Sequence, residues 1–171
     1  AHAQKTEAEE RTKELEKILQ LDAQFRELSQ SSTLKYIEDK KTFVAKDFIG
    51  IEIFQPNDDV IKPEYLPTVD KVGNDLYTLL TKLHSNNPNF SYQLVIEGNA
   101  AIEYGKLIKN QYDPDNDEMN KLSFRRALAL YHRWQNVLRL DIRQYNTEII
   151  ISGSGFNGIN SDNDLEDNNK R

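Results

Sequence analysis

Short apolar runs alternate with longer amphipathic stretches between residues 42 and 152, and this order constrains the fold most strongly. The apolar runs are typical of strands: one or two over 42–54, with Ile49–Phe54 the stronger, then Ser91–Ile96 and Thr147–Ser152. Apolar residues at spacings of three and four predict helices over 63–83 and 123–140, the second with Ser123 as its N-cap. Strands separated by helices favour right-handed crossovers, so we expect an α/β (α+β sandwich) domain with helices covering a mixed, largely parallel sheet.

A separate helix is predicted before this domain. Residues 5–29 contain neither Gly nor Pro and are rich in Glu, Lys, Leu, Gln and Ala. A short coiled-coil-like seam falls at spacings of three, four and three: Ile18, Leu21, Phe25 and Leu28. Either this helix packs on its own domain or it pairs with a second copy as a parallel dimer stalk. We therefore divide the chain into a helical stalk or linker, 1–41, and a globular domain, 42–171.

Composition excludes several classes of partner and site. The net charge of −6 over 171 residues argues against binding to a nucleic-acid backbone. The absence of cysteine excludes disulfides and thiolate metal sites. No run of residues approaches the ~20 apolar positions that a membrane-spanning helix needs.

Two motifs resemble catalytic or metal sites but lack essential parts. Residues 153–158 match G-x-G-x-x-G after a strand, yet a dinucleotide fold needs a helix at the third glycine and a further strand. The aspartates of 113–118 alternate as in a calcium loop, but the required Gly and Glu are missing. No acid–base pair or nucleophile motif is present either. We predict no catalytic residue, no cofactor and no metal, and hence no enzyme.

One combination of motifs resembles a known family. Its parts are Ile96-Glu97-Gly98, Leu122-Ser123-Phe124-Arg125-Arg126-Ala127, Ser152-Gly153-Ser154-Gly155 and Asn169-Lys170-Arg171. Together they are similar to I-x-G-H-T-D, L-S-x-x-R-A, G-x-G and N-x-R of the OmpA/MotB C-terminal domain, the peptidoglycan-associating module of bacterial envelope proteins. The resemblance covers roughly residues 45–171 and implies a β-α-β-α-β core, with the family's final strand absent from this chain.

The resemblance also implies a ligand site with one half altered. Family members clamp the diaminopimelate end of the stem peptide between an Asp and an Arg. The Arg corresponds to Arg126, expected in the first turn of its helix, where guanidinium and backbone N–H groups both favour a carboxylate. The Asp corresponds to Ala101, and Glu103 is a candidate substitute. The predicted ligand-binding residues are Asn99, Ala101, Glu103, Ser123 and Arg126.

Two functions follow from these expectations. The first is a non-catalytic module that binds peptidoglycan non-covalently and tethers a membrane-bound protein or stator-like complex. The second is a divergent module that no longer binds diaminopimelate and serves oligomerisation or protein contacts in an envelope assembly. Both predict a periplasmic or cell-envelope location, anchored by a segment before residue 1. The expected partners are peptidoglycan, a second copy and a membrane subunit, without nucleic acid.

Overall fold

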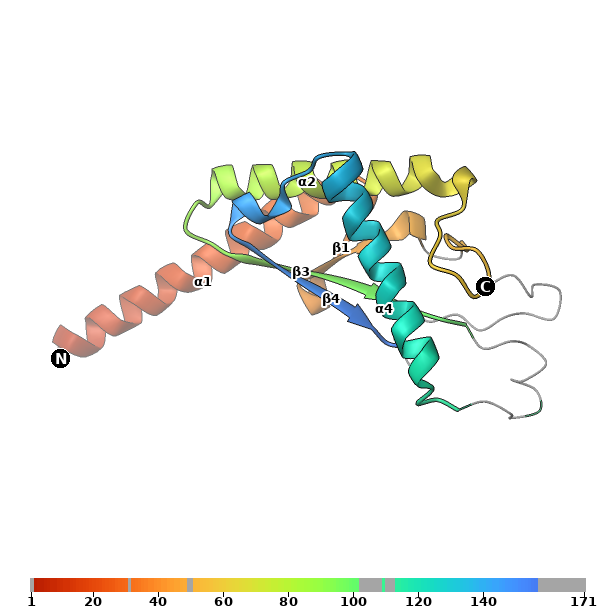
Figure 1. Ribbon diagram of the computed structural model, residues 1–171. Helices are drawn as coiled ribbons and strands as arrows, with labels where there is room; N and C mark the ends of the chain where they lie inside the picture. The colour runs from red at the N-terminus through yellow and green to blue at the C-terminus, as the bar shows by residue number, and fades with distance from the viewer. Residues whose placement is uncertain (1, 31, 49–50, 102–108, 110–112, 157–171) are drawn as a thin grey trace. The chain divides into compact units, whose positions relative to one another are not determined.

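The computed structural model describes residues 2–30, 32–48, 51–101, 109 and 113–156, and it combines helices with two small sheets (Figure 1). The predicted mixture of helix and strand is therefore confirmed. The chain forms two compact units, Ala1–Asp47 and Phe48–Arg171, and each contains one two-stranded sheet.

The first unit is a long helix followed by a β-hairpin. The helix α1 (His2–Ser29) confirms the helix predicted over 5–29. After it, β1 (Leu34–Ile37) pairs antiparallel with β2 (Thr42–Ala45), joined by the short helix η1 (Glu38–Lys40), and η2 (Lys46–Phe48) follows. Lys41 closes the hairpin turn in the left-handed conformation, with a φ of 53°. β2 lies within the 42–54 region where one or two strands were predicted, whereas β1 and its pairing with β2 were not predicted.

Aromatic side chains form the contact between α1 and the hairpin. The ring of Phe25 lies 5.2 Å from that of Tyr36 and 5.4 Å from that of Phe43, in edge-to-face geometry. Tyr36 and Phe43 themselves are 5.0 Å apart. Such pairs stabilise packing beyond the area they bury. Phe25, a residue of the predicted seam, thus packs inside its own unit.

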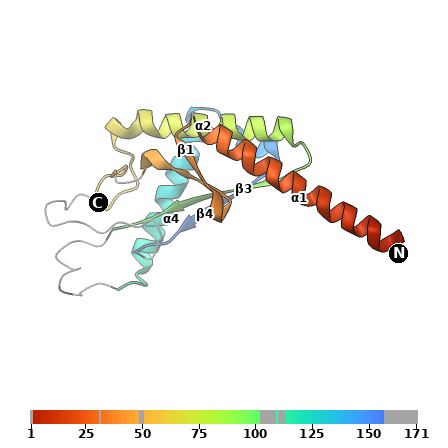
Figure 2. The same cartoon turned by 180° about the vertical axis from the view of Figure 1, so that it is seen from behind.

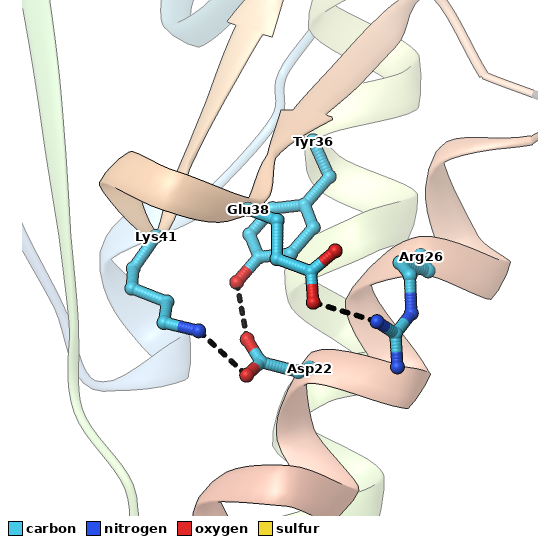
Figure 3. Close-up of polar contacts among 5 residues, drawn as sticks. All are labelled: Asp22, Arg26, Tyr36, Glu38 and Lys41. Atoms are coloured by element: carbon cyan, nitrogen blue, oxygen red, sulfur yellow. Dashed lines mark hydrogen bonds and ion pairs between the residues drawn. The ribbon is translucent and has the colours of Figure 1, made fainter.

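A polar cluster joins the same two elements (Figure 3). The carboxylate of Asp22 accepts hydrogen bonds from the Tyr36 hydroxyl and the Lys41 ammonium, both at 2.6 Å, and Arg26 pairs with Glu38 at 2.6 Å. The bonds from Lys41 and Tyr36 hold the pKa of Asp22 below its ordinary 3.8. Burial and the neighbouring Asp22 raise the pKa of Tyr36 to about 12. One face of the second half of α1 is therefore committed to the hairpin.

The second unit is built on two parallel strands joined by a helix. Its elements are η3 (Pro63–Tyr65), α2 (Leu66–Asn86), β3 (Tyr92–Gly98), α4 (Asp117–His132), the π-helical η4 (Arg133–Val137), η5 (Ile142–Tyr145) and β4 (Thr147–Gly153). β3 and β4 pair in register from Tyr92 opposite Thr147 to Gly98 opposite Gly153. α4 covers one face of this pair, in front of it in Figure 1 and behind it in Figure 2.

The core of this unit comes mainly from the apolar faces of α2 and α4. It contains Val69, Val72, Leu76, Leu79, Leu80, Leu83, Ile96, Leu122, Ala127, Leu130, Tyr131, Trp134 and Ile142. Trp134 lies against Gly73, where a Cβ would come within 2.3 Å of the indole ring, and its Nε1 donates to the Val69 carbonyl at 2.9 Å. Arg133 forms two bonds of 2.8 Å to Asp70 beside this contact. The helices are therefore fixed to each other by apolar packing and by charge.

The strand predicted over Ile49–Phe54 is wrong for the described residues 51–54. Only Phe54 forms a bridge, antiparallel to Ile61, and residues 49 and 50 lie outside the described residues. The backbone pairs locally instead, because Gln55 donates to the Val60 carbonyl and Lys62 donates to that of Ile53. The Gln55–Val60 turn thus forms an irregular hairpin within the described part of the chain.

The helix predicted from Ser123 begins earlier, at Asp117. Asn116 is its N-cap, because the Asn116 side chain accepts a hydrogen bond from the Met119 amide at 3.1 Å. The carboxylates of Asp117 and Glu118 in the first turn also interact favourably with the positive end of the helix dipole. Ser123 is therefore not the N-cap, and Arg126 lies well inside the helix rather than in its first turn.

Candidate functional site

The candidate site lies where β3 and β4 end. Gly98 and Gly153 are the last residues of the paired strands, and the loops that follow are joined by hydrogen bonds. Ala100 donates to the Gly155 carbonyl at 2.9 Å, and the Ser154 amide donates to the Gly98 carbonyl at 3.1 Å. Carboxyl ends of parallel strands are common places for ligand sites in α/β proteins. This end is where the sequence placed its candidate residues.

Both terminal glycines allow α4 to approach the strands closely. A Cβ on Gly98 would lie 1.7 Å from the Ser123 backbone oxygen, and one on Gly153 would lie 2.4 Å from the Phe124 nitrogen. Backbone cannot move aside as a flexible side chain can, so glycine is required at both positions. Gly153, the first glycine of the G-x-G, therefore has a packing role here.

Ser123 joins α4 to the loop after β4. Its side chain is fully buried, its hydroxyl donates to the Asn120 carbonyl at 2.9 Å, and it accepts from the Gly155 amide at 2.8 Å. Both hydrogen-bonding functions of the hydroxyl are thus used inside the fold. Ser123 lies near the predicted site, but its side chain holds the loop rather than facing a ligand.

Arg126 is the centre of this arrangement, and it is only 6% exposed. Its Nε donates to the Asp58 carbonyl at 2.8 Å, Nη1 to the Asn99 carbonyl at 3.1 Å and Nη2 to the Gln55 carbonyl at 3.3 Å. The guanidinium also lies 5.3 Å from the centre of the Phe54 ring. Within the described part of the chain, its hydrogen-bond acceptors are all backbone carbonyls.

The electrostatics of Arg126 reflect this burial. Removal from water lowers the pKa of its guanidinium, while the charges of Asp58 and Asp59 oppose that change. Asp59 itself pairs with the neighbouring, half-exposed Arg125 at 3.6 Å. Arg125 and Arg126 therefore hold the Gln55–Val60 turn against α4, one at the surface and one in the interior.

The structure brings together three of the five predicted site residues: Asn99, Ser123 and Arg126. Asn99 accepts from Arg126 through its carbonyl and from the Ser154 hydroxyl through its side chain, at 2.6 Å. Ala101 is half-buried and follows the buried Ala100, so this stretch supplies no acidic side chain. Glu103 lies outside the described residues.

The sequence missed the turn over Gln55–Val60 as a part of this site. Its two carbonyls that receive Arg126 come from residues about 70 positions earlier in the chain. The sequence Gln-Pro-Asn-Asp-Asp indicated a turn, but nothing in it marked two carbonyls as acceptors for a distant arginine.

No family model, curated protein or solved structure matches this chain. In the part that the structure describes, no group of three or more His, Asp or Glu side chains is placed to hold a metal ion. No helix among those described is both long and apolar enough to cross a membrane.

Proposed function

We propose that this chain is a divergent OmpA/MotB-like module of the bacterial cell envelope that acts without catalysis, through protein contacts in an envelope assembly. Three features support the family assignment: L-S-x-x-R-A within α4, the glycine ends of both strands, and the α2–β3–α4–β4 order. Under this proposal, the short hairpin around Phe54 and Ile61 takes the place of the first strand of the family's domain.

The main support for the assembly role is the set of hydrogen bonds that Arg126 makes. In a diaminopimelate clamp this guanidinium faces a carboxylate and an acid holds the ammonium. Here the guanidinium donates to three backbone carbonyls, and the position of the acid is Ala101. Among the described residues, a zwitterionic ligand would meet a guanidinium already bonded to three carbonyls and no acid at position 101, which supports a structural role within a protein-binding module.

Peptidoglycan anchoring is the second candidate, and one observation favours it. A guanidinium carries five N–H donors, and the bonds to Gln55, Asp58 and Asn99 use three of them. A buried cation without a hydrogen-bonded carboxylate is costly, and a ligand carboxylate would offset that cost. The peptidoglycan stem peptide could supply such a group.

Co-sedimentation with purified sacculi at two salt concentrations separates the two candidates. We compare wild type with Ala101→Asp, which restores the family's acid, and with Asn74→Asp, which adds a charge at an exposed position of α2. The assembly role predicts that wild type and Asn74→Asp stay in solution. Sedimentation of Ala101→Asp alone would indicate a family pocket that lost its acid. Salt-resistant sedimentation of wild type would instead overturn the assembly role in favour of anchoring.

A further inference from the structure

The first half of α1 exposes apolar side chains on one face. Every described side chain from residue 4 to residue 20 is exposed. Leu15, Ile18 and Leu19 are 61, 50 and 67% exposed, and their spacing places them side by side on the helix. A helical stretch of this length is marginal in water by itself, and such a cluster on a charged helix indicates a partner.

We propose that this half of α1 pairs with a second copy of the chain as a parallel two-stranded coiled coil. The seam consists of residues at spacings of three, four, three and four: Lys5, Ala8, Thr12, Leu15 and Leu19. Ile18 lies beside this seam and widens its apolar end. Spacings that average 3.5 residues keep one stripe facing the partner helix over its whole length. This interface involves α1 alone and is independent of any ligand at the ends of β3 and β4.

Charge complementarity selects both the partner and the orientation. Arg11 flanks the seam on one side, and Glu9 and Glu16 flank it on the other. In a parallel pair Arg11 lies next to Glu16 of the second copy, five residues further along, and the two-fold axis repeats this pair. An antiparallel pair would instead place glutamates opposite glutamates. The stripe is therefore complementary to itself in the parallel orientation only.

The hairpin sets where the coiled coil ends. The next seam position after Leu19 is Asp22, whose carboxylate is buried and bonded to Tyr36 and Lys41 (Figure 3). Phe25, one turn further, packs on the hairpin rings. The C-terminal part of the seam predicted over Ile18–Leu28 therefore packs within the first unit. The seam that remains exposed lies closer to the N-terminus of α1.

Cysteine cross-linking tests the orientation directly, because the chain has no natural cysteine. Ala8→Cys and Thr12→Cys lie on the seam, where in a parallel pair each residue faces the same residue of the second copy. Glu10→Cys lies on the opposite, exposed side of the helix. We expect both seam variants of the full chain to form disulfide dimers at least ~10-fold faster than Glu10→Cys, because disulfides need closely spaced Cβ atoms. Equal rates in all three variants would overturn the proposal.

Charge reversal tests the pairing without a cross-link. Arg11→Glu and Glu16→Arg should each weaken self-association in sedimentation equilibrium, and the double variant should restore it. These residues are five apart and are not neighbours on one helix, so restoration reports a contact between copies. A double variant no stronger than the singles, or a wild type that is monomeric at every concentration, would overturn the proposal. Fluorescence of Trp134 in the second unit serves as the control for folding.

Discussion

Replacement of Arg126 by alanine would distinguish a structural clamp from a ligand-binding residue. A clamp stabilises the fold, so its removal lowers the free energy of unfolding. A residue kept for a ligand often carries an unfavourable buried charge, and its removal is then neutral or stabilising. Because Arg126 bonds to carbonyls in two separate loops, we expect the first behaviour.

The magnitude follows from the three bonds of the guanidinium. Hydrogen bonds to charged groups contribute about 1.5–3 kcal/mol each. Removal of the guanidinium from water offsets several kcal/mol of that gain, so we expect a net loss of about 2–4 kcal/mol for Arg126→Ala. Arg126→Lys should lose nearly as much, because an ammonium cannot reach three carbonyls in the geometry of a planar fork.

Urea unfolding followed by tryptophan fluorescence provides the assay. Trp134 is the only tryptophan, it is 3% exposed, and it lies in the same unit as Arg126. A loss of this size should lower the unfolding midpoint by roughly 1–2 M urea. The matched control is Arg125→Ala, which removes a half-exposed ion pair with Asp59 and should change stability by less than about 1 kcal/mol.

Equal midpoints for Arg126→Ala and Arg125→Ala would refute the clamp. The three carbonyl bonds would then contribute nothing measurable to stability. A stable Arg126→Ala variant that also lost an affinity for sacculi would return the site to the anchoring function.

Three further results are expected. Gly98→Ala should lower stability by at least about 2 kcal/mol in the same urea assay, because its Cβ would lie 1.7 Å from the Ser123 backbone oxygen. Asp22→Asn should reduce amide protection of the β1–β2 hairpin at pH 7. Since Lys41 holds the pKa of Asp22 below 3.8, the stabilisation is lost as the pH falls below that value, and wild type and variant should converge in acid. Tyr36→Phe should remove one tyrosine absorbance step at about pH 12. The raised pKa of Tyr36 also means that the stability it contributes is lost as the pH rises from 10 to 12.

The elements that the sequence predicted well are those with a long, repeated pattern. The helices α1 and α2 and the strands β3 and β4 all occur close to the expected residues. Their apolar spacing is a local property of the sequence, and the long repeats of α1 and α2 fit only a helix. The start of α4 was missed, although Asn116 followed by Asp117 and Glu118 is a recognisable N-terminal signal.

The strand β1 and its pairing into a hairpin are what local pattern did not predict, whereas β2 lies within the predicted strand region 42–54. Leu34–Ile37 is four residues long, and so short an alternation is compatible with a loop. Its stability depends on Phe25 and Asp22, which belong to a helix earlier in the chain. The same contacts show that Phe25 of the predicted seam packs within its own unit, a choice between own-unit and partner contact that the sequence left open.

The sequence by itself determined the helices α1 and α2, the strands β3 and β4, which side chains are apolar, and which family the motifs resemble. Only the tertiary structure decided what Arg126 does. Its acceptors at Gln55, Asp58 and Asn99 are main-chain carbonyls, and every residue of the chain carries such a group. Because all residues share this acceptor, the sequence cannot indicate which carbonyls will bond to Arg126. The role of this arginine therefore depends on which turns the fold places next to it.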